Sequence, residues 1–438
     1  MSEFTYPERL EIAPLAKPVA ASVTVPGSKS ITNRALVLAA LASRETSCTL
    51  TGALRSEDTE VMVECLQRLG FRVEPDWDRA TITIHKNESG RLIPAKTADL
   101  YVANSGTTMR FLAAMVSLSE GEYRLDGVPR MRERPIQDLL DALRQLGVDA
   151  KSEIGNGCPP IIVRSKGWTE SRVRVRGDVS SQFLSGLLLA AGWALQDTSI
   201  TIEGILVSTP YIEMTLSMLE LWVARVAWAG DILVVIADQH NGPMEYAIEP
   251  DASAASYFWA AAAITGGRVT VLGLTRKSLQ GDVAFVDMLE RMGCRVEECE
   301  AGITIHGGPL RGIDVDMNAI SDTVMTLGAV ACFAEGPTTI RNVAHIRHKE
   351  TDRIAALATE LRKLGAEVEE FEDGLRITPR PLTGCAVDTY NDHRMAMSLA
   401  LVGLRVPGVV VNDPGCVAKT YPGFWQDLDR LRQGERGA

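Results

Sequence analysis

Two hydrophobic patterns alternate along the chain in a fixed order. Short runs such as residues 80–84 and 303–305 alternate apolar and polar side chains, the two-residue period of half-buried strands. Ala/Leu-rich runs such as residues 185–194 and 257–264 are apolar almost all round, as expected of helices buried inside a domain. The pattern therefore predicts an α/β protein with buried helices.

The order repeats six times. Each unit has a strand-like run, a polar turn and an Ala/Leu-rich run, and the anchor residues of the six turns are Ser28, Ser105, Ser181, Ala252, Asp322 and Asp392. A second helical run in most units ends in glycine, which fits a left-handed closing residue, and these glycines are Gly70, Gly147, Gly293, Gly365 and Gly434. In the third unit Trp222 takes that place. The repeat therefore predicts that each unit has the order β-α-β-α-β-β over roughly 70 residues.

The repeat also predicts the domain organisation. Units one to three and units four to six form two similar globular domains, and the chain crosses between them at residues 245–250. If both domains direct their helix N-termini at a shared cleft, that cleft will hold an anionic ligand, because helix N-termini carry free N–H groups and partial positive charge.

Composition narrows the function classes. The chain has 438 residues, 45 Lys and Arg against 56 Asp and Glu, and a net charge of −11, which disfavours nucleic acid and anionic membranes as partners. Its apolar runs are shorter than the ~20 residues of a membrane span. Eight cysteines without a CxxC pair, and an N-terminus without a signal-peptide pattern, predict a reducing cytoplasmic location. We find no metal-ligand spacing.

The first anchor predicts an anion site. Ser28 is placed to cap a helix whose first turn holds Lys29 and Ser30, with Arg34 one turn later. The glycine needed for a Walker A loop is missing upstream, so a nucleotide phosphate loop is not indicated. Cations at a helix N-terminus oppose the helix dipole unless an anion binds there, so Lys29 and Arg34 are candidate ligands for an anion.

A second cationic cluster begins at Lys349. Lys349, Glu350 and Arg353 are spaced to share one face at the start of a predicted helix. The alternative is a solvated ion-pair face. Asp322 is by itself an ordinary N-cap, and its pairing with Glu350 as acid and base is a hypothesis from spacing.

The sixth anchor repeats this pattern. Asp392 is predicted to cap a helix, and Arg394 again lies at the end where the dipole disfavours a cation. His393 alone is more typical of a packed or capping histidine than of a catalyst.

Five motifs in register resemble the 5-enolpyruvylshikimate-3-phosphate synthase family. They are Pro26-Gly27-Ser28-Lys29-Ser30 with Asn33-Arg34, Asn104-Ser105-Gly106-Thr107 with Met109-Arg110, Arg132-Glu133-Arg134-Pro135, Lys349-Glu350-Thr351-Asp352-Arg353, and Asn391-Asp392-His393-Arg394-Met395-Ala396-Met397. The resemblance implies two globular domains of three β-α-β-α-β-β repeats each, an inverse α/β barrel-like fold with the ligand cleft between them. It assigns residues 25–246 to a first, shikimate 3-phosphate domain, and residues 1–24 with 247–438 to a second, phosphoenolpyruvate domain.

The resemblance also implies the reaction. The family transfers the enolpyruvyl group of phosphoenolpyruvate to the 5-hydroxyl of shikimate 3-phosphate, releasing phosphate by addition and elimination through a tetrahedral intermediate, in the shikimate pathway to chorismate and the aromatic amino acids. It implies no metal and no organic cofactor, and we expect a monomer.

The resemblance also assigns substrate-binding and catalytic roles to individual residues of this sequence. By resemblance, shikimate 3-phosphate is held by Lys29, Ser30, Arg34, Ser180, Ser181, Gln182, Ser208, Tyr211, Asp322, His345 and Lys349. Phosphoenolpyruvate is held by Lys29, Gly106, Arg134, Gln182, Arg353, Arg394 and Lys419. The implied catalytic residues are Asp322 for the hydroxyl proton, Glu350 for the methylene carbon and Lys29 for developing charge.

The chain departs from the family pattern at three positions. His345 stands where Asn is expected, Ser105 replaces the usual Ala, and Phe111 replaces a common Pro. Ser105 and Phe111 neighbour the phosphoenolpyruvate pocket, which the herbicide glyphosate also occupies in this family. Two alternatives remain: transfer to a UDP-aminosugar, and a binding homologue without catalysis.

Overall fold

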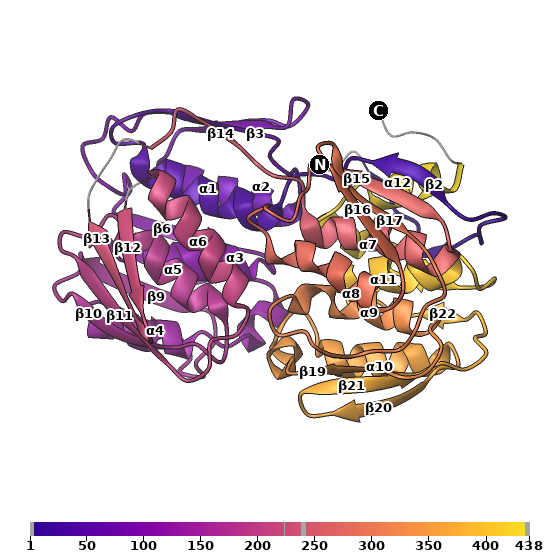
Figure 1. Ribbon diagram of the computed structural model, residues 1–438. Helices are drawn as coiled ribbons and strands as arrows, with labels where there is room; N and C mark the ends of the chain where they lie inside the picture. Colours follow the sequence, from indigo (N-terminus) through magenta and orange to yellow (C-terminus); the bar gives the residue numbers. More distant parts are fainter. Residues whose placement is uncertain (1–3, 223, 238–241, 434–438) are drawn as a thin grey trace. The chain divides into compact units, whose positions relative to one another are not determined.

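A computed structural model describes residues 4–222, 224–237 and 242–433, drawn as a ribbon in Figure 1. The chain divides into two compact units: unit 1, Met1–Pro26 with Glu249–Ala438, and unit 2, Gly27–Ile248. Both units are mixed α/β, and the predicted fold of repeated β-α-β-α-β-β units is confirmed. We describe each unit separately.

Unit 2 has three four-stranded sheets in the described residues. Their strand orders are β14 (Glu245–Ala247), β3 (Cys48–Thr51), β5 (Thr81–Ile84), β4 (Val73–Asp76); β6 (Thr97–Tyr101), β7 (Glu120–Asp126), β9 (Ile161–Lys166), β8 (Asp149–Ser152); and β10 (Arg172–Arg176), β11 (Thr198–Glu203), β13 (Ile232–Ala237), β12 (Ala224–Ala229). Its helices are α1 (Lys29–Ala42), α2 (Glu57–Arg68), α3 (Gly106–Val116), the 3₁₀ turn η1 (Pro129–Glu133), α4 (Gln137–Gln145), α5 (Ser181–Ala191) and α6 (Thr209–Trp222).

Unit 1 has two four-stranded sheets and one three-stranded sheet in its described part. Their strand orders are β16 (Arg295–Cys299), β17 (Gly302–His306), β15 (Arg268–Leu272), β2 (Ala20–Val23); β18 (Asp314–Asp316), β19 (Thr338–Arg341), β21 (Gly374–Thr378), β20 (Glu367–Phe371); and β1 (Arg9–Glu11), β23 (Val410–Asn412), β22 (Ala386–Val387). Its helices are α7 (Ala252–Thr265), η2 (Gly281–Ala284), α8 (Phe285–Arg291), η3 (Ser321–Thr323), α9 (Val324–Ala331), η4 (Ala344–His348), α10 (Arg353–Lys363), α11 (His393–Gly403), η5 (Pro414–Lys419) and α12 (Phe424–Gln433).

Every four-stranded sheet has the same topology. Two parallel strands lie together and two antiparallel strands complete the sheet, as in the sheet that contains β6 to β9. There Leu100 pairs with Leu125 and Leu125 pairs with Ile161, and all three side chains are buried. The period-two pattern therefore fixes which face of each sheet packs on the helices.

Two of the four-stranded sheets take an edge strand from a distant part of the chain. β14 follows the third repeat, yet it pairs in parallel with β3 of the first repeat, with Tyr246 opposite Leu50. β2 lies near the N-terminus and pairs in parallel with β15, with Ala21 opposite Val269. Each unit is therefore closed by a strand that its own consecutive repeats do not supply.

The predicted buried helices are present in both units. In unit 1, α7, α9 and α11 pack against one another, and α7 is buried from Ala252 to Ile264. In unit 2, α1, α3 and α5 pack together in the same way. A row of buried hydroxyls joins the three helices of unit 1: Ser256 lies 3.1 Å from Thr326, and Thr326 lies 3.3 Å from Ser398.

The predicted closing glycines have the expected backbone. Gly70, Gly147, Gly293 and Gly365 have φ of 89°, 88°, 111° and 105°, the left-handed region that glycine adopts without a Cβ clash. Trp222 ends α6 instead, and Gly434 lies outside the described residues. None of the described helices is long and apolar enough to cross a bilayer.

Candidate active site

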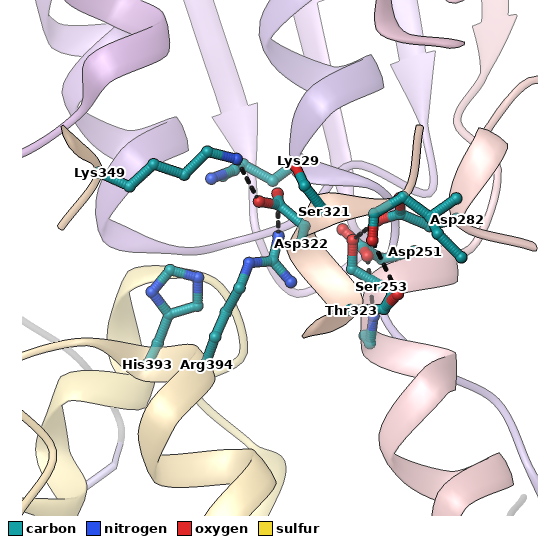
Figure 2. A network of polar contacts seen from close by, with 12 residues as sticks. Lys29, Asp251, Ser253, Asp282, Ser321, Asp322, Thr323, Lys349, His393 and Arg394 are labelled. Carbon is teal, nitrogen blue, oxygen red and sulfur yellow. Dashed lines mark hydrogen bonds and ion pairs between the residues drawn. The ribbon is translucent and has the colours of Figure 1, made fainter. Parts of the chain in front are cut away.

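Three cations surround the carboxylate of Asp322 in unit 1. Oδ1 of Asp322 lies 2.5 Å from Nζ of Lys349 and 3.1 Å from Nη1 of Arg353, and Oδ2 lies 2.7 Å from Nη2 of Arg394. Figure 2 shows the carboxylate between Lys349 and Arg394. The three cations come from the start of α10, the start of α11 and the bend after η4, so the fifth and sixth repeats meet at this carboxylate.

These cations keep Asp322 ionised. Burial alone would raise the pKa of Asp322, but the charges of Arg394, Lys349 and Arg353 outweigh it and hold the pKa well below its ordinary value. Burial also lowers the pKa of Lys349, against the opposing attraction of Asp322. Asp322 is therefore a carboxylate whose basicity depends on whether its cationic partners stay in place.

The predicted N-cap role of Asp322 is wrong. Asp322 lies in η3, and Thr323 occupies the N-cap position of α9. A tight 3₁₀ turn precedes the helix, so the helix begins later than the spacing predicts. Asp322 lies among two cations of its own repeat, Lys349 and Arg353, and one of the sixth, Arg394.

The predicted shared helix face of Lys349, Glu350 and Arg353 is also wrong. α10 begins only at Arg353, because Asp352 is its N-cap and accepts a hydrogen bond from the amide of Ala355 at 3.0 Å. Lys349 lies before the helix, with φ −86° and ψ −145°. Glu350 nevertheless meets Arg353, with Oε2 accepting from Nη2 at 2.8 Å.

Arg353 is the hub of this cluster. Its side chain is 1% exposed, and it donates to Asp322, Glu350 and both carboxylate oxygens of Asp392, the Nε bond to Asp392 Oδ2 being 2.8 Å. Asp392, Glu350 and Asp322 raise the pKa of Arg353 despite the opposing effect of burial. We call the residues joined in this way the unit 1 cluster: Asp322, Lys349, Glu350, Arg353, Asp392 and Arg394.

The sequence reasoning assigned Asp392 only a cap. The cap is confirmed, since Oδ1 accepts from the Arg394 amide at 2.9 Å. Its second oxygen accepts from Arg353, which the sequence reasoning missed. A helix cap needs only one carboxylate oxygen, so the second oxygen of Asp392 is left for another donor. The only hint of this in the sequence was the number of basic residues in the neighbouring motifs.

His345 and Lys419 are buried in the same unit. Nε2 of His345 lies 2.9 Å from Oγ of Ser321, the residue before Asp322. Burial and the charge of Lys349 lower the pKa of His345 to about 3, so the imidazole is neutral at physiological pH. Lys419 ends η5 and is 4% exposed.

A buried aspartate in η2 was not assigned a role by sequence reasoning. Ser253, in the first turn of α7, donates a hydrogen bond to Oδ2 of Asp282, as drawn in Figure 2. Burial, together with the negative charge of Asp322, raises the pKa of Asp282 to about 6. Its position in a polar start of the fourth repeat was the only sequence signal.

In unit 2, the start of α1 has the predicted geometry. Ser28 caps the helix by accepting from the amide of Ile31 at 3.4 Å, and Lys29 and Ser30 occupy the first turn. Nζ of Lys29 lies 3.3 Å from Oδ2 of the buried Asp58. The sequence reasoning did not identify this carboxylate partner, which comes from the first turn of α2.

Arg34 lies inside unit 2 rather than on its surface. Its guanidinium donates to the Ser30 carbonyl at 2.9 Å, Thr215 Oγ1 at 2.8 Å, Ser185 Oγ at 3.3 Å and the Tyr211 carbonyl at 3.2 Å. These partners are uncharged, and burial lowers the pKa of Arg34 to about 10. Arg34 thus ties α1 to α5 and α6 and carries a buried positive charge.

Phe111 lies against this buried charge. Its ring centroid is 5.2 Å from Cζ of Arg34, and the ring of Tyr211 is 5.9 Å from the same atom. Aromatic faces attract cations most strongly where water is excluded. Phe111 therefore contacts Arg34, one of the residues predicted to hold substrate.

Gly106 is the first residue of α3 and lies beneath two guanidinium groups. A Cβ there would be 2.5 Å from Nη2 of Arg134 and 2.6 Å from Nη1 of Arg110. Arg134 donates to the Asn104 carbonyl at 3.0 Å and lies between η1 and α4, which begins at Gln137. Lacking a Cβ, Gly106 lets both guanidinium groups approach the free amides of a helix N-terminus.

The remaining predicted residues of unit 2 lie at the starts of α5 and α6. Ser180 caps α5, Ser181 is buried in its first turn, and Gln182 Nε2 donates to Thr107 Oγ1 of α3 at 3.3 Å. Ser208 precedes α6 in the left-handed region with φ 53°. The predicted set is thus divided: unit 2 holds Lys29, Ser30, Arg34, Gly106, Arg134, Ser180, Ser181, Gln182, Ser208 and Tyr211, and unit 1 holds Asp322, His345, Lys349, Glu350, Arg353, Arg394 and Lys419.

Comparison with known proteins gives one consistent family. Residues 15–428 match the family described as EPSP synthase (3-phosphoshikimate 1-carboxyvinyltransferase). A 3-phosphoshikimate 1-carboxyvinyltransferase of Nostoc punctiforme is 49% identical over 95% of this chain and 98% of its own. The chloroplastic enzyme of that name from Arabidopsis thaliana is 44% identical over 93% of this chain and 82% of its own.

Solved structures agree with the sequence comparison. The EPSP synthase of Acinetobacter baumannii superimposes with a TM-score of 0.80 at 27% identity, covering 97% of this chain and 98% of its own. The enolpyruvyl transferase NikO of Streptomyces tendae superimposes with a TM-score of 0.76 at 21% identity, covering 97% of each chain, which shows a shared fold alone. The repeat, the unit 1 cluster and the matches over nearly the whole chain agree: this chain belongs to the EPSP synthase family.

Proposed function

We propose how the residues of the two units divide the work of the family's reaction. As a member of the family, the chain transfers the enolpyruvyl group of phosphoenolpyruvate to shikimate 3-phosphate. We take the acceptor atom to be the 5-hydroxyl and the path to be addition followed by elimination of phosphate. The family match favours shikimate 3-phosphate over a UDP-aminosugar as the acceptor.

The binding roles follow from charge and position. Shikimate 3-phosphate is assigned to Lys29, Ser30, Arg34, Ser180, Ser181, Gln182, Ser208, Tyr211, Asp322, His345 and Lys349. Phosphoenolpyruvate is assigned to Lys29, Gly106, Arg134, Gln182, Arg353, Arg394 and Lys419. Each set draws on both units, so we propose that residues 25–246 and residues 1–24 with 247–438 act on the same pair of substrates, the former mainly on shikimate 3-phosphate and the latter mainly on phosphoenolpyruvate.

The chemistry requires proton transfers at two atoms. Protonation of the methylene carbon of phosphoenolpyruvate makes C2 electrophilic, and the acceptor hydroxyl adds to C2 as it loses its proton. We assign the hydroxyl proton to Asp322 and the methylene proton to Glu350, which returns to remove a proton from the new methyl group as phosphate leaves. Lys29 stabilises negative charge at the reacting centre.

One observation carries the assignment of Asp322: its carboxylate is held by three cations that an anionic substrate can attract away. Those cations make Asp322 a weak base. A substrate phosphate or carboxylate that attracts Arg394 and Arg353 weakens their hold on Asp322, so its pKa rises toward the ordinary value. Binding of the anionic substrate therefore turns Asp322 into a stronger base when the hydroxyl is present.

The test is phosphate release by the purified protein with phosphoenolpyruvate and shikimate 3-phosphate, omitting each substrate in turn. We expect release only with both substrates. Asp322→Asn keeps the shape and removes the base, so turnover falls by orders of magnitude while calorimetry still detects shikimate 3-phosphate binding. Full turnover by this variant would refute the role of Asp322, and no turnover by the folded natural protein would refute the function.

Two coarser properties complete the proposal. We propose that the protein acts as a monomer, which is supported by a single chain supplying every residue assigned to both substrates. We propose a cytoplasmic location, which is supported by eight cysteines that are all free thiols. Size-exclusion chromatography with light scattering, and fractionation of cells, test these two statements.

A further inference from the structure

The loop that delivers Arg394 has an unusual backbone. It joins β22 to α11, and within it Tyr390 and Asn391 both have left-handed backbone angles, with φ of 54° and 52°. Asparagine tolerates this region, but a residue with a bulky side chain adopts it at a cost in free energy. Such a conformation persists only where surrounding contacts hold it.

Glu360 of α10 contacts this loop at two residues, and Lys363 and Asn412 bind the side chain of Asp388 in the same loop. The Glu360 carboxylate is fully buried, and Oε1 accepts a hydrogen bond from the Tyr390 hydroxyl at 2.6 Å. Oε2 accepts from the amide of Asp388 at 3.0 Å, and Nζ of Lys363 lies 2.9 Å from Oε1. A buried carboxylate needs such partners to offset its loss of water, so the loop and Glu360 stabilise each other.

α10 therefore grips the loop at two points. Arg353, the first residue of α10, binds Asp392, which follows Tyr390 and Asn391 in the chain. Glu360, seven residues later in α10, binds Tyr390 itself and Asp388, which precedes it. Residues seven apart lie on one face of a helix. These two sets of contacts fix the direction in which the chain enters α11. Arg394 is the second residue of that helix.

We propose that Glu360 and Tyr390 are positioning residues for the enolpyruvyl transfer. By holding Tyr390 and Asn391 in the left-handed conformation, they direct Asp392 to Arg353 and Arg394 to Asp322. Neither residue is assigned to substrate. The inference rests on the proposed function through the roles given to Arg394 and Asp322.

The hydroxyl of Tyr390 suits this role over a wide pH range. Burial and the hydrogen bond to Glu360 raise the pKa of Tyr390 to about 12. The hydroxyl therefore stays protonated at physiological pH and can donate to Glu360 there.

The first test is Tyr390→Phe, which keeps the ring and removes only the hydroxyl. Because hydrogen bonds to charged groups are the strong ones, we expect kcat/KM for phosphoenolpyruvate to fall about tenfold. KM for shikimate 3-phosphate should stay within about twofold, since most of its assigned residues lie in unit 2. Hydrogen exchange should become faster in peptides that cover residues 388–394.

A glycine substitution separates positioning from packing. Tyr390→Ala and Tyr390→Gly both lose the ring and the hydroxyl, but glycine adopts the left-handed region without a Cβ penalty. We expect Tyr390→Gly to recover part of the activity that Tyr390→Ala loses. A residue that acted only by packing would give equal losses in both variants.

The matched control is Tyr123→Phe. Tyr123→Phe also removes one hydroxyl hydrogen bond, to the Ala95 carbonyl at 2.8 Å, but in unit 2 and outside the assigned set. We expect it to keep the natural kcat/KM.

Three results overturn the inference: unchanged kcat/KM in Tyr390→Phe, an equal loss in Tyr123→Phe, or no advantage of glycine over alanine. If the natural protein releases no phosphate with both substrates, the proposed function fails instead, so the two failures are distinguishable.

Discussion

Arg353 makes the sharpest prediction about the unit 1 cluster. Replacing it with methionine keeps much of the volume and removes four hydrogen bonds to three carboxylates. Asp392 is fully buried and Glu350 is 8% exposed, so neither carboxylate can recover its lost partner from bulk water. Breaking buried pairs of this kind costs about 3–5 kcal/mol of unfolding free energy, and we expect Arg353→Met to lose that amount at pH 7.

The pH dependence checks the cause. The pKa of Asp322 is lowered in the folded protein, so its contribution to stability is present above its unfolded pKa of about 3.9 and is lost as the pH falls through the folded value. Arg353→Met weakens this stabilisation. The difference in unfolding free energy between the two proteins should therefore be largest near neutral pH and shrink below about pH 4.

The assay is guanidinium chloride unfolding of the natural protein, Arg353→Met and the control Arg380→Met at several pH values. Arg380 pairs with Glu367 at 2.6 Å, but the two side chains are 56% and 54% exposed, so we expect the control to lose less than about 1 kcal/mol. Equal losses in both variants, or a loss in Arg353→Met that does not change with pH, would refute the reasoning.

Three further predictions concern other parts of the two units. Gly106→Ala pushes a Cβ against two guanidinium groups, and steady-state kinetics should show KM for phosphoenolpyruvate rising more than tenfold while KM for shikimate 3-phosphate changes little. The pKa of Asp282 is raised to about 6 in the folded protein. Between about pH 4 and pH 6 the folded state therefore binds more protons at this group than the unfolded state does. Raising the pH through this range should lower the free energy of unfolding by roughly 3 kcal/mol. Denaturation across that range should show the loss in the natural protein and a flatter curve in Asp282→Asn. Phe111→Leu removes a ring 5.2 Å from Arg34, which should weaken shikimate 3-phosphate binding about two- to fivefold by calorimetry; unchanged binding would exclude a role of the ring in holding the guanidinium.

Features encoded locally could be predicted from the sequence. The alternating runs, the anchors and the closing glycines each depend on a few neighbouring residues. The structure begins a helix at five of the six anchors and gives Gly70, Gly147, Gly293 and Gly365 the expected backbone. The helix beginnings near Asp322 and Lys349 were misplaced, because 3₁₀ turns and a competing cap at Asp352 shift the first helical residue. Such shifts depend on small differences in free energy between alternative local conformations. The spacing of residues in the sequence does not reveal these differences.

The site could be predicted as a set of residues but not as a network. The repeat indicates that anchor residues lie at equivalent helix ends, and the spacing suggested only that Asp322 pairs with Glu350. The partners of Arg34 are hydroxyls and carbonyls up to 181 residues away, and no periodicity marks such groups. The role of Glu360 could not be predicted from the sequence either. The sequence pattern does not distinguish a buried glutamate in a helix from an exposed one.

The exchange of strands between distant repeats bears on how the chain matures during synthesis. Unit 2 is one continuous stretch, Gly27–Ile248, closed by β14 at its far end, so a nascent chain can complete it long before the ribosome finishes. Unit 1 needs β2 from the beginning of the chain and α11 from near its end, and domains generally fold as units. Strand β2 must therefore wait without its partner β15 while more than two hundred residues are made, and truncation near the C-terminus should leave unit 2 folded and unit 1 incomplete.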